Sequence, residues 1–338
     1  MDARPTDLSG WRLHRVDLTS YDEQLRGAVV AGALFVDCTL PDGLADDLRD
    51  RGALVFGDLP AVPIDTERIT LYSPDELYDS PSYPASLDAR VHAWSKQRPT
   101  REMRLAEALH DHAIDEALAA WVDDRRIAGV MGGHALTRAD RGYREATLLG
   151  QGLGDRFTVA TGGGPGAMEA ANLGAWLDSP DDIDPALALL AAAPSFTPDV
   201  GAWAAAGFAV LEQWPDGRPS LGIPTWHYGH EPPNVFASAI AKYFRNATRE
   251  ATLLQLCDAG IVFLEGAGGT VQEIFQDACE NYYADESSIA PMVLVGRSYW
   301  TLDLPAWPLL QRLSRGRPME GHVHLVDRVD EAVALLIG

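Results

Sequence analysis

Short apolar runs alternate with longer amphipathic stretches along most of the chain. Runs of about four to eight apolar residues are typical of buried strands, whereas apolar positions three and four apart predict helices. On this basis we expect strands at residues 127–131, 157–160, 208–213, 220–224, 261–264, 291–295 and 323–326. We expect helices at residues 87–96, 103–122, 143–152, 167–177, 186–193, 235–245, 248–258, 270–283, 306–315 and 331–337.

Strands that alternate with helices predict an α/β fold, here a Rossmann-like, doubly wound parallel sheet with helices on both faces. We assign this sheet to residues 101–338, and residues 1–100 to a small N-terminal α/β extension and connector. In the extension we expect two strands, one helix and a connector rich in proline and tyrosine, at residues 32–38, 53–56, 42–51 and 59–84. No group of residues with obvious chemistry stands out there, so we expect a structural or interface role, with a contribution to ligand specificity as the alternative.

Three glycine-rich turns, at residues 132–134, 161–166 and 265–270, follow expected strands. In a parallel sheet the ends of those strands lie at one edge, so we expect the turns to lie together. A glycine turn before a helix binds phosphate, because the backbone can approach the anion and the first helical N–H groups point at it. The residues that we expect to contact such a ligand are Gly132, Gly133, His134, Gly162, Gly163, Gly164, Pro165, Gly166, Met168, Glu169, Gly266, Gly268, Gly269 and Thr270.

The second turn also satisfies the dinucleotide pattern G-x-G-x-x-G/A through Gly162, Gly164 and Ala167. That fold requires an acidic residue at the end of the next strand, about 20 residues on. Here this distance falls in a polar loop at 178–184, so an oxidoreductase that uses NAD or FAD is the weaker alternative. No lysine lies near the turns and no G-x-S-x-G elbow occurs, which argues against a P-loop ATPase and a serine hydrolase.

The 338-residue chain carries a formal net charge of −22, which repels nucleic acid and anionic membranes. No stretch of about 18 uninterrupted apolar residues predicts a transmembrane helix, and the N-terminus has no apolar signal segment. The 3 cysteines lack C-x-x-C spacing and favour reduced thiols in a cytoplasmic protein. A small phosphate ligand therefore needs a local cationic pocket against the overall charge.

Two of the turns resemble those of the Lonely Guy (LOG) family, which comprises cytokinin-activating phosphoribohydrolases and bacterial nucleotide 5′-monophosphate nucleosidases. The sequences GGGPGAMEAAN at 162–172 and GAGGTVQE at 266–273 carry the resemblance. The family signature is P-G-G-x-G-T-x-x-E. Its core from Gly269 to Glu273 is intact here, while Glu265 stands where the family usually has proline. The resemblance covers about residues 126–295.

The resemblance implies hydrolysis of the N-glycosidic bond of a nucleoside 5′-monophosphate, which gives a free base and ribose 5-phosphate. Glu273 would be the catalytic carboxylate and Arg249 the catalytic arginine. Arg245 is a substitute, because Arg249 is one residue farther from the turn than the family spacing implies. N-glycoside cleavage passes through an oxocarbenium-like sugar that a carboxylate stabilises, and an arginine can hold phosphate or sugar oxygens. The resemblance also implies a homodimer, with no metal and no cofactor.

Three alternatives remain open on these residues. Thr270 and Glu273 also form a capping box, in which Glu273 reaches back to the start of its own helix. Arg249 can pair on the surface with Glu250 or Glu280. The protein can also be a non-catalytic nucleotide sensor or carrier on the same fold.

Histidines and aromatic residues provide further candidates. His134 directly follows the first turn and is the histidine that we expect nearest to a ligand. His322 and His324 share one face of a strand, but no third metal ligand is evident. A loop after a strand can stack on a base or pack in a dimer, and it contains Trp226, His227, Tyr228 and His230.

Overall fold

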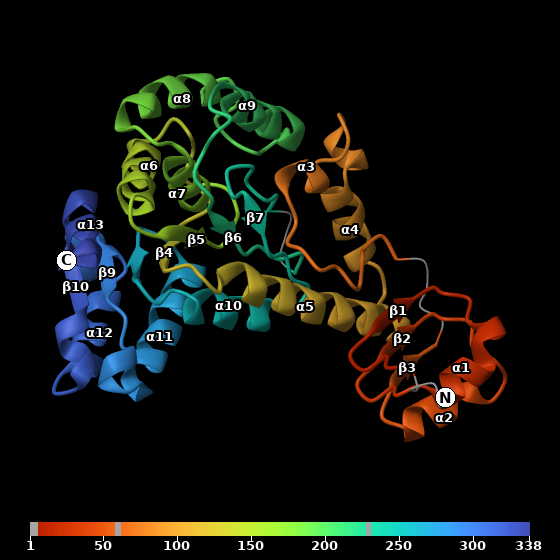
Figure 1. Cartoon of the computed structure of the whole chain (residues 1–338). Helices are drawn as coiled ribbons and strands as arrows, with labels where there is room; N and C mark the ends of the chain where they lie inside the picture. The colour runs from red at the N-terminus through yellow and green to blue at the C-terminus, as the bar shows by residue number, and fades with distance from the viewer. Residues whose placement is uncertain (1–5, 58–61, 228–230) are drawn as a thin grey trace. The chain divides into compact units, whose positions relative to one another are not determined.

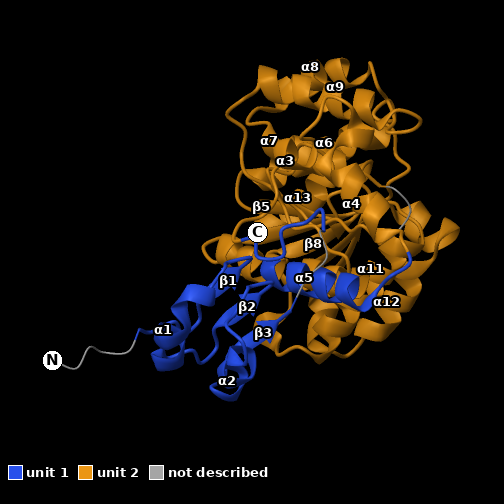
Figure 2. Ribbon diagram, turned by 90° about the vertical axis from the view of Figure 1, so that its right-hand side faces the viewer, with its two compact units in different colours: residues 1–68, 98–113 blue, residues 69–97, 114–338 orange. Residues whose placement is uncertain are grey.

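The computed structural model describes residues 6–57, 62–227 and 231–338 (Figure 1). The chain divides into two compact units (Figure 2). Unit 1 comprises residues 1–68 and 98–113, and unit 2 comprises residues 69–97 and 114–338. Residues 69–97, which we assigned to the extension, therefore group with the large sheet. Helix α5 (Arg101–Val122) contributes its first part to unit 1 and the rest to unit 2.

Unit 1 is built on a parallel sheet in the order β1-β2-β3. Its elements are β1 (Arg12–His14), α1 (Asp22–Gly27), β2 (Leu34–Val36), α2 (Leu44–Asp50) and β3 (Leu54–Phe56). Phe35, Leu44 and Leu48 are fully buried in a core that the strands share with the two helices. This is the small α/β extension expected from the sequence, with β1 and α1 in addition to the predicted elements.

Unit 2 is built on a seven-stranded sheet in the order β10-β9-β8-β4-β5-β6-β7, and all its neighbouring strands are parallel. The strands are β4 (Ile127–Met131), β5 (Thr158–Thr161), β6 (Leu221–Gly222), β7 (Ala239–Ile240), β8 (Gly260–Phe263), β9 (Met292–Val295) and β10 (Val323–Val326). The predicted doubly wound sheet is confirmed. Its strand order reverses between β4 and β8, and the crevice at such a point is where ligands of this fold class bind.

Helices cover both faces of this sheet, with α6, α7 and α13 on one face and α10, α11 and α12 on the other (Figure 1). Besides α5, the α-helices of unit 2 are α3 (Pro74–Leu77), α4 (Leu87–Ser95), α6 (Arg141–Gly154), α7 (Ala167–Trp176), α8 (Ile183–Leu190), α9 (Val200–Gln213), α10 (Asn246–Gln255), α11 (Gly268–Tyr283), α12 (Ala306–Ser314) and α13 (Val329–Ile337). Within the described ranges, every helix is too short or too polar to span a bilayer.

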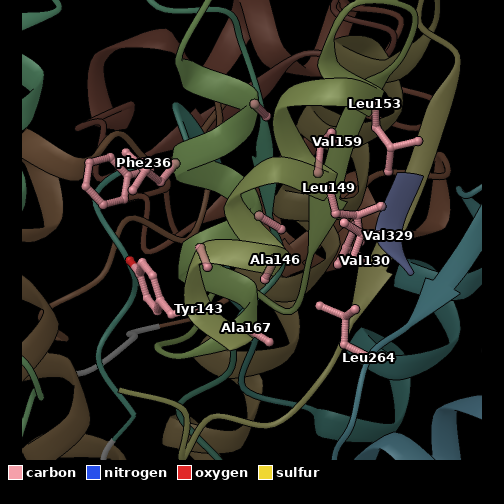
Figure 3. Close-up of a cluster of buried hydrophobic side chains, with 14 of the residues drawn as sticks. Val130, Tyr143, Ala146, Leu149, Leu153, Val159, Ala167, Phe236, Leu264 and Val329 are labelled. Atoms are coloured by element: carbon pink, nitrogen blue, oxygen red, sulfur yellow. The ribbon is translucent and has the colours of Figure 1, made fainter. Parts of the chain in front are cut away.

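A large core lies under α6 and α7. Figure 3 shows Ala146 and Leu149 of α6 among Val130 of β4 and Val159 of β5. The two helices approach very closely, because a Cβ at Gly150 would lie only 2.0 Å from the carbonyl oxygen of Ala171. This packing holds the start of α7, and with it the second glycine turn, against the end of β4.

Two predicted elements are wrong. Residues 208–213, expected as a strand, are the end of α9, whose N-cap Asp199 accepts a hydrogen bond from the N–H of Ala202. Residues 235–245, expected as a helix, contain the short strand β7. Nearly all side chains from 235 to 244 are buried. The apolar residues there are therefore apolar because the whole segment is enclosed, and not because they form one face of an amphipathic helix.

A buried charged cluster fixes residues 69–97 to the sheet of unit 2. Asp88 of α4 pairs with Lys242, two residues after β7, and both side chains are almost fully buried. The indole N–H of Trp226 donates to Asp88 Oδ1 at 2.9 Å, and the Tyr83 hydroxyl donates to Oδ2 at 2.7 Å. Burial lowers the pKa of Lys242, and the charge of Asp88 opposes that shift. Each partner thus makes burial of the other tolerable.

We expect Lys242→Met to lower the free energy of unfolding by about 3–5 kcal/mol, because it leaves the Asp88 carboxylate buried without its counter-charge. Urea denaturation at pH 7 measures the loss. The double variant Lys242→Met/Asp88→Asn removes both charges and should recover most of it. An equal loss in the single and double variants would show that packing around the Lys242 stem, and not the ion pair, fixes this segment.

Candidate functional site

The three glycine turns meet at the carboxyl ends of β4, β5 and β8, which are neighbours in the sheet. The N–H of Gly133 donates to the carbonyl of Glu265 at 3.1 Å, which joins the first turn to the third. The N–H of Ala167 donates to the carbonyl of Gly133 at 3.1 Å, which joins the second turn to the first. Gly166 has a φ of +75°, and a Cβ there would lie 2.5 Å from the Gly133 oxygen. The expectation that the turns share one edge is confirmed.

Buried hydrogen bonds to Thr161 and Asn234 hold the second turn in place. The N–H of Gly163 donates to the hydroxyl of Thr161 at 2.9 Å. Asn234 donates from its backbone to the Gly163 carbonyl at 2.8 Å and from its side chain to the Gly164 carbonyl at 3.1 Å. Residues 162–166 are all buried. We expected this turn to hold phosphate through its N–H groups, and the N–H of Gly163 is engaged by Thr161. The phosphate contact of this turn stays a prediction.

A cavity of about 790 Å³ opens beside the first and third turns. The expected site residues that line it are Gly132, Gly133, His134, Met168, Arg249, Gly266, Gly268, Gly269, Thr270 and Glu273. The second turn reaches this cavity only indirectly. A Cβ at Gly162 would lie 2.7 Å from Met168 Sδ and 3.0 Å from Arg249 Nη2, so the absence of a side chain makes room for both lining residues.

The cavity is acidic. The residues that line it include Asp140, Glu231, Glu250, Glu265 and Glu273. Among the described residues that line it, Arg249 is the single arginine, and lysine is absent. His134 lies at the rim with its Nδ1 atom 3.4 Å from Glu231 Oε1. The groups of this cavity that can attract an anion are therefore Arg249, His134 and backbone N–H groups at the start of α11.

Arg249 lies between two carboxylates. Its Nη1 atom is 2.7 Å from Glu250 Oε2 and 3.8 Å from Glu273 Oε1, and all three side chains are nearly buried. The 2.7 Å pair is not aligned as a hydrogen bond. Within the part of the chain that the structure describes, Arg249 Nε and Nη1 and Glu250 Oε2 have no hydrogen-bond partner. The expected pairing of Arg249 with Glu250 is thus present, but it is buried rather than on the surface.

Glu273 is a weak acid in this setting. Burial raises its pKa to about 8, an effect that Arg249 opposes and Glu250 reinforces. The alternative capping box does not form as expected, because α11 begins at Gly268 with Ala267 as its N-cap. Thr270 packs its hydroxyl against Gly266 instead, where an added Cβ would lie 2.1 Å from Oγ1. Glu273 therefore faces the cavity rather than the first N–H groups of its own helix.

A second buried acid lies one turn further along α11. Burial raises the pKa of Asp277 to about 8, and the charge of Glu280 adds to the shift. Asn281 donates to Asp277 Oδ1 at 3.5 Å, while Oδ2 has no hydrogen-bond partner among the described residues. We did not expect this residue from the sequence, although its spacing of four from Glu273 places both on one face of the helix.

Glu169, which we expected to contact the ligand, is taken up by a buried ion pair. Arg138 Nε donates to Glu169 Oε1 at 3.0 Å, and both side chains are only 1% exposed. Burial raises the pKa of Glu169, and Arg138 opposes the shift. With Pro165, Gly166 and His134, Glu169 lines an adjoining cavity of about 270 Å³, which shares His134 with the large one. The pair holds the first turn of α7 in place, and nothing in the sequence marked Arg138 as its partner.

Arg245 is exposed at the N-cap of α10 and is not among the residues that line the large cavity. Arg249, one turn later, does line this cavity. His324 lies on β10, and both burial and His322 lower its pKa. Among the described residues there is no cluster of three or more histidine, cysteine or acidic side chains that could hold a metal ion.

Of the aromatic loop, the structure places Trp226 in the protein core. Trp226 is 2% exposed and stacks on Phe244, with ring centroids 4.7 Å apart. It belongs to the buried cluster around Asp88, not to a base-stacking or dimer surface. His227 is exposed, and Tyr228 and His230 lie outside the described residues. Glu231, which follows them, lines the large cavity.

No known family model matches the chain, and neither does any curated protein. Solved structures do match it. One is a molybdenum cofactor binding protein from the phototrophic bacterium Rippkaea orientalis, with 18% identity over 63% of this chain and 96% of that one, and a TM-score of 0.40. Another is the molybdenum cofactor carrier protein from Chlamydomonas reinhardtii, with the same identity and coverage and a TM-score of 0.38. Likeness at this level says nothing about the ligand or the reaction of this chain.

Proposed function

We propose that unit 2 binds a nucleoside 5′-monophosphate in the large cavity and hydrolyses its N-glycosidic bond. One observation carries the proposal: Glu273 and Arg249, from two consecutive helices, lie on one cavity together with the turns that follow β4 and β8. The resemblance of these residues to phosphoribohydrolases supports the same assignment. A cavity of about 790 Å³ is large enough for a mononucleotide.

The 5′-phosphate binds at the start of α11 in this proposal. Gly268 and Gly269 are exposed there, and a Cβ at either would meet nothing within 4 Å, so the backbone is open to a ligand. The unpaired N–H groups of the first helical turn and the helix dipole attract an anion. The neighbouring carboxylates oppose it, so we expect phosphate affinity to come from close backbone contacts rather than from net charge.

Glu273 acts as the general acid. With a pKa of about 8 it is mostly protonated at pH 7 and can donate its proton to the departing base as the N-glycosidic bond breaks. The sugar then carries oxocarbenium character, and the new Glu273 carboxylate stabilises it. Water adds to the anomeric carbon and returns a proton to Glu273. Arg249, 3.8 Å from the carboxyl group, favours the transient charged form of Glu273.

The test is to incubate the protein with a panel of nucleoside 5′-monophosphates and to separate the products by chromatography. We expect free base and ribose 5-phosphate in equal amounts from at least one nucleotide. Tight binding without product would favour the non-catalytic sensor or carrier instead. Neither binding nor product from any nucleotide would remove the proposal altogether.

A further inference from the structure

Glu250 is a buried acid that the proposed reaction does not use. It follows Arg249 directly on α10, is 6% exposed and lines the large cavity. Its Oε2 atom lies 2.7 Å from Arg249 Nη1, whereas the nearest Glu273 oxygen lies 3.8 Å from the same nitrogen. The Arg249 guanidinium therefore neighbours two buried carboxyl groups, and it lies closer to Glu250, which has no role in the proposed reaction, than to Glu273.

We propose that Glu250 is a positioning residue that keeps the Arg249 guanidinium paired with itself rather than with Glu273. Coulomb attraction falls with distance and is strong in a buried site, so the partner at 2.7 Å receives most of the compensation. A charged Glu250 also repels a charge on Glu273. Both effects favour the protonated form of Glu273. The pairing can be tested on the free protein, whereas its consequence for catalysis rests on the proposed function.

The groups that face Glu273 support this pairing of Arg249 with Glu250. From α10 and its end these are Arg249, Glu250 and Cys257, whose thiol is fully buried and has its pKa raised well above the usual value by burial. Asp277 lies one turn further along α11 and is itself a weak acid. Arg249 is thus the one positive charge acting on Glu273 in this set, and Glu250 is the group that competes for it.

The pairing leaves Arg249 able to change partner. Its Nε and Nη1 atoms have no aligned hydrogen-bond acceptor within the described ranges, so movement toward Glu273 breaks no well-formed hydrogen bond. When Glu273 gives up its proton to the departing base, its negative charge attracts the guanidinium. Glu250 therefore sets the resting state in which Glu273 is an acid, and Arg249 can stabilise the state that follows proton transfer.

The experiment is a carboxyl-carbon NMR titration of the free protein, with Glu273→Gln to assign the Glu273 signal. We expect a midpoint of about 8 in the wild type. Glu250→Gln should lower it by about one to three pH units, because Arg249 is released to Glu273 and a repelling charge is lost. Glu265→Gln is the matched control. Glu265 is exposed, lines the same cavity and is not among the groups that shift the pKa of Glu273, so its loss should leave the midpoint unchanged.

An unchanged or raised midpoint in Glu250→Gln would overturn the inference. If that variant does not fold, Glu250→Asp keeps the charge on a shorter side chain and should lower the midpoint part of the way, and no shift there would be equally decisive. Where the wild type releases base, the alkaline limb of its kcat/KM profile should move with the midpoint. A lowered midpoint without any base release would support the role of Glu250 and refute the proposed function. Base release with an unchanged midpoint would support the proposed function and refute the role of Glu250.

Discussion

Replacing Asp277 with asparagine is expected to stabilise the folded protein strongly at alkaline pH. Burial without a cationic partner raises the pKa of Asp277 to about 8 from a usual value of 3.8, so the folded state holds a proton that the unfolded state loses. Between these two values the wild type loses about 1.4 kcal/mol of stability for each pH unit on account of this residue. Asparagine removes that loss and keeps an oxygen that can accept from Asn281.

The sign of this pH dependence follows from the state that binds the proton, which is the folded state. Below about pH 4 both states are protonated and the full stability is present. As the pH rises toward 8 the unfolded state ionises first and stability falls. We therefore expect the advantage of Asp277→Asn over wild type to grow by about 3–4 kcal/mol between pH 5 and pH 8. Urea unfolding at several pH values measures it, and an advantage that is constant with pH would contradict the assignment of Asp277 as a buried neutral acid.

Replacing Glu273 with glutamine is expected to abolish base release while nucleotide binding persists. Glutamine has the same shape but cannot donate a proton as an acid, and a positioned general acid contributes roughly 10²–10⁴-fold to such a step. We expect kcat to fall by that factor. Because the pKa of Glu273 is also raised to about 8, the variant should be more stable than wild type at pH 8.

Asp277→Asn is the matched control for this experiment. Both substitutions remove a buried acid with a pKa of about 8 from the same helix, but Glu273 lines the cavity and Asp277 does not. We expect both variants to gain stability at pH 8 and Glu273→Gln alone to lose activity. Equal loss of activity in both would mean that the chemistry depends on the rigidity of α11 rather than on Glu273 as an acid.

The strand–turn–helix units of the large sheet could be predicted because each is encoded locally. Ile127–Met131, for example, is a buried apolar run that ends at glycines, and the structure has β4 over the same residues. The failures occurred where local pattern and environment diverge. The sequence FAVLEQ at 208–213 contains a short apolar run of the kind that predicts a strand, but it ends an alanine-rich helix that Asp199 caps. Residues 235–244 are enclosed on nearly all sides, so their spacing reports burial alone.

The candidate site was predictable to the extent that it depends on chain order. Turns after parallel strands must share an edge, and this brought Gly132, Gly268 and Glu273 to one cavity. Hydrogen-bond and ion-pair partners that tertiary packing brings together could not be predicted from the sequence. Arg138, 31 residues before Glu169 in the chain, turns an expected ligand contact into a buried ion pair. Thr161 and Asn234 likewise bind the second turn internally, which no local pattern indicated.

We expect a nucleotide to occupy the cavity between the turns after β4 and β8, with its sugar beside Glu273. A crystal structure of Glu273→Gln with a nucleoside 5′-monophosphate tests this most directly, because the variant binds without turnover. We predict phosphate oxygens within hydrogen-bond distance of the N–H groups of Gly268 or Gly269, and an anomeric carbon about 3–4 Å from the side chain at position 273. A nucleotide bound elsewhere, or an empty cavity at saturating nucleotide, would contradict the account.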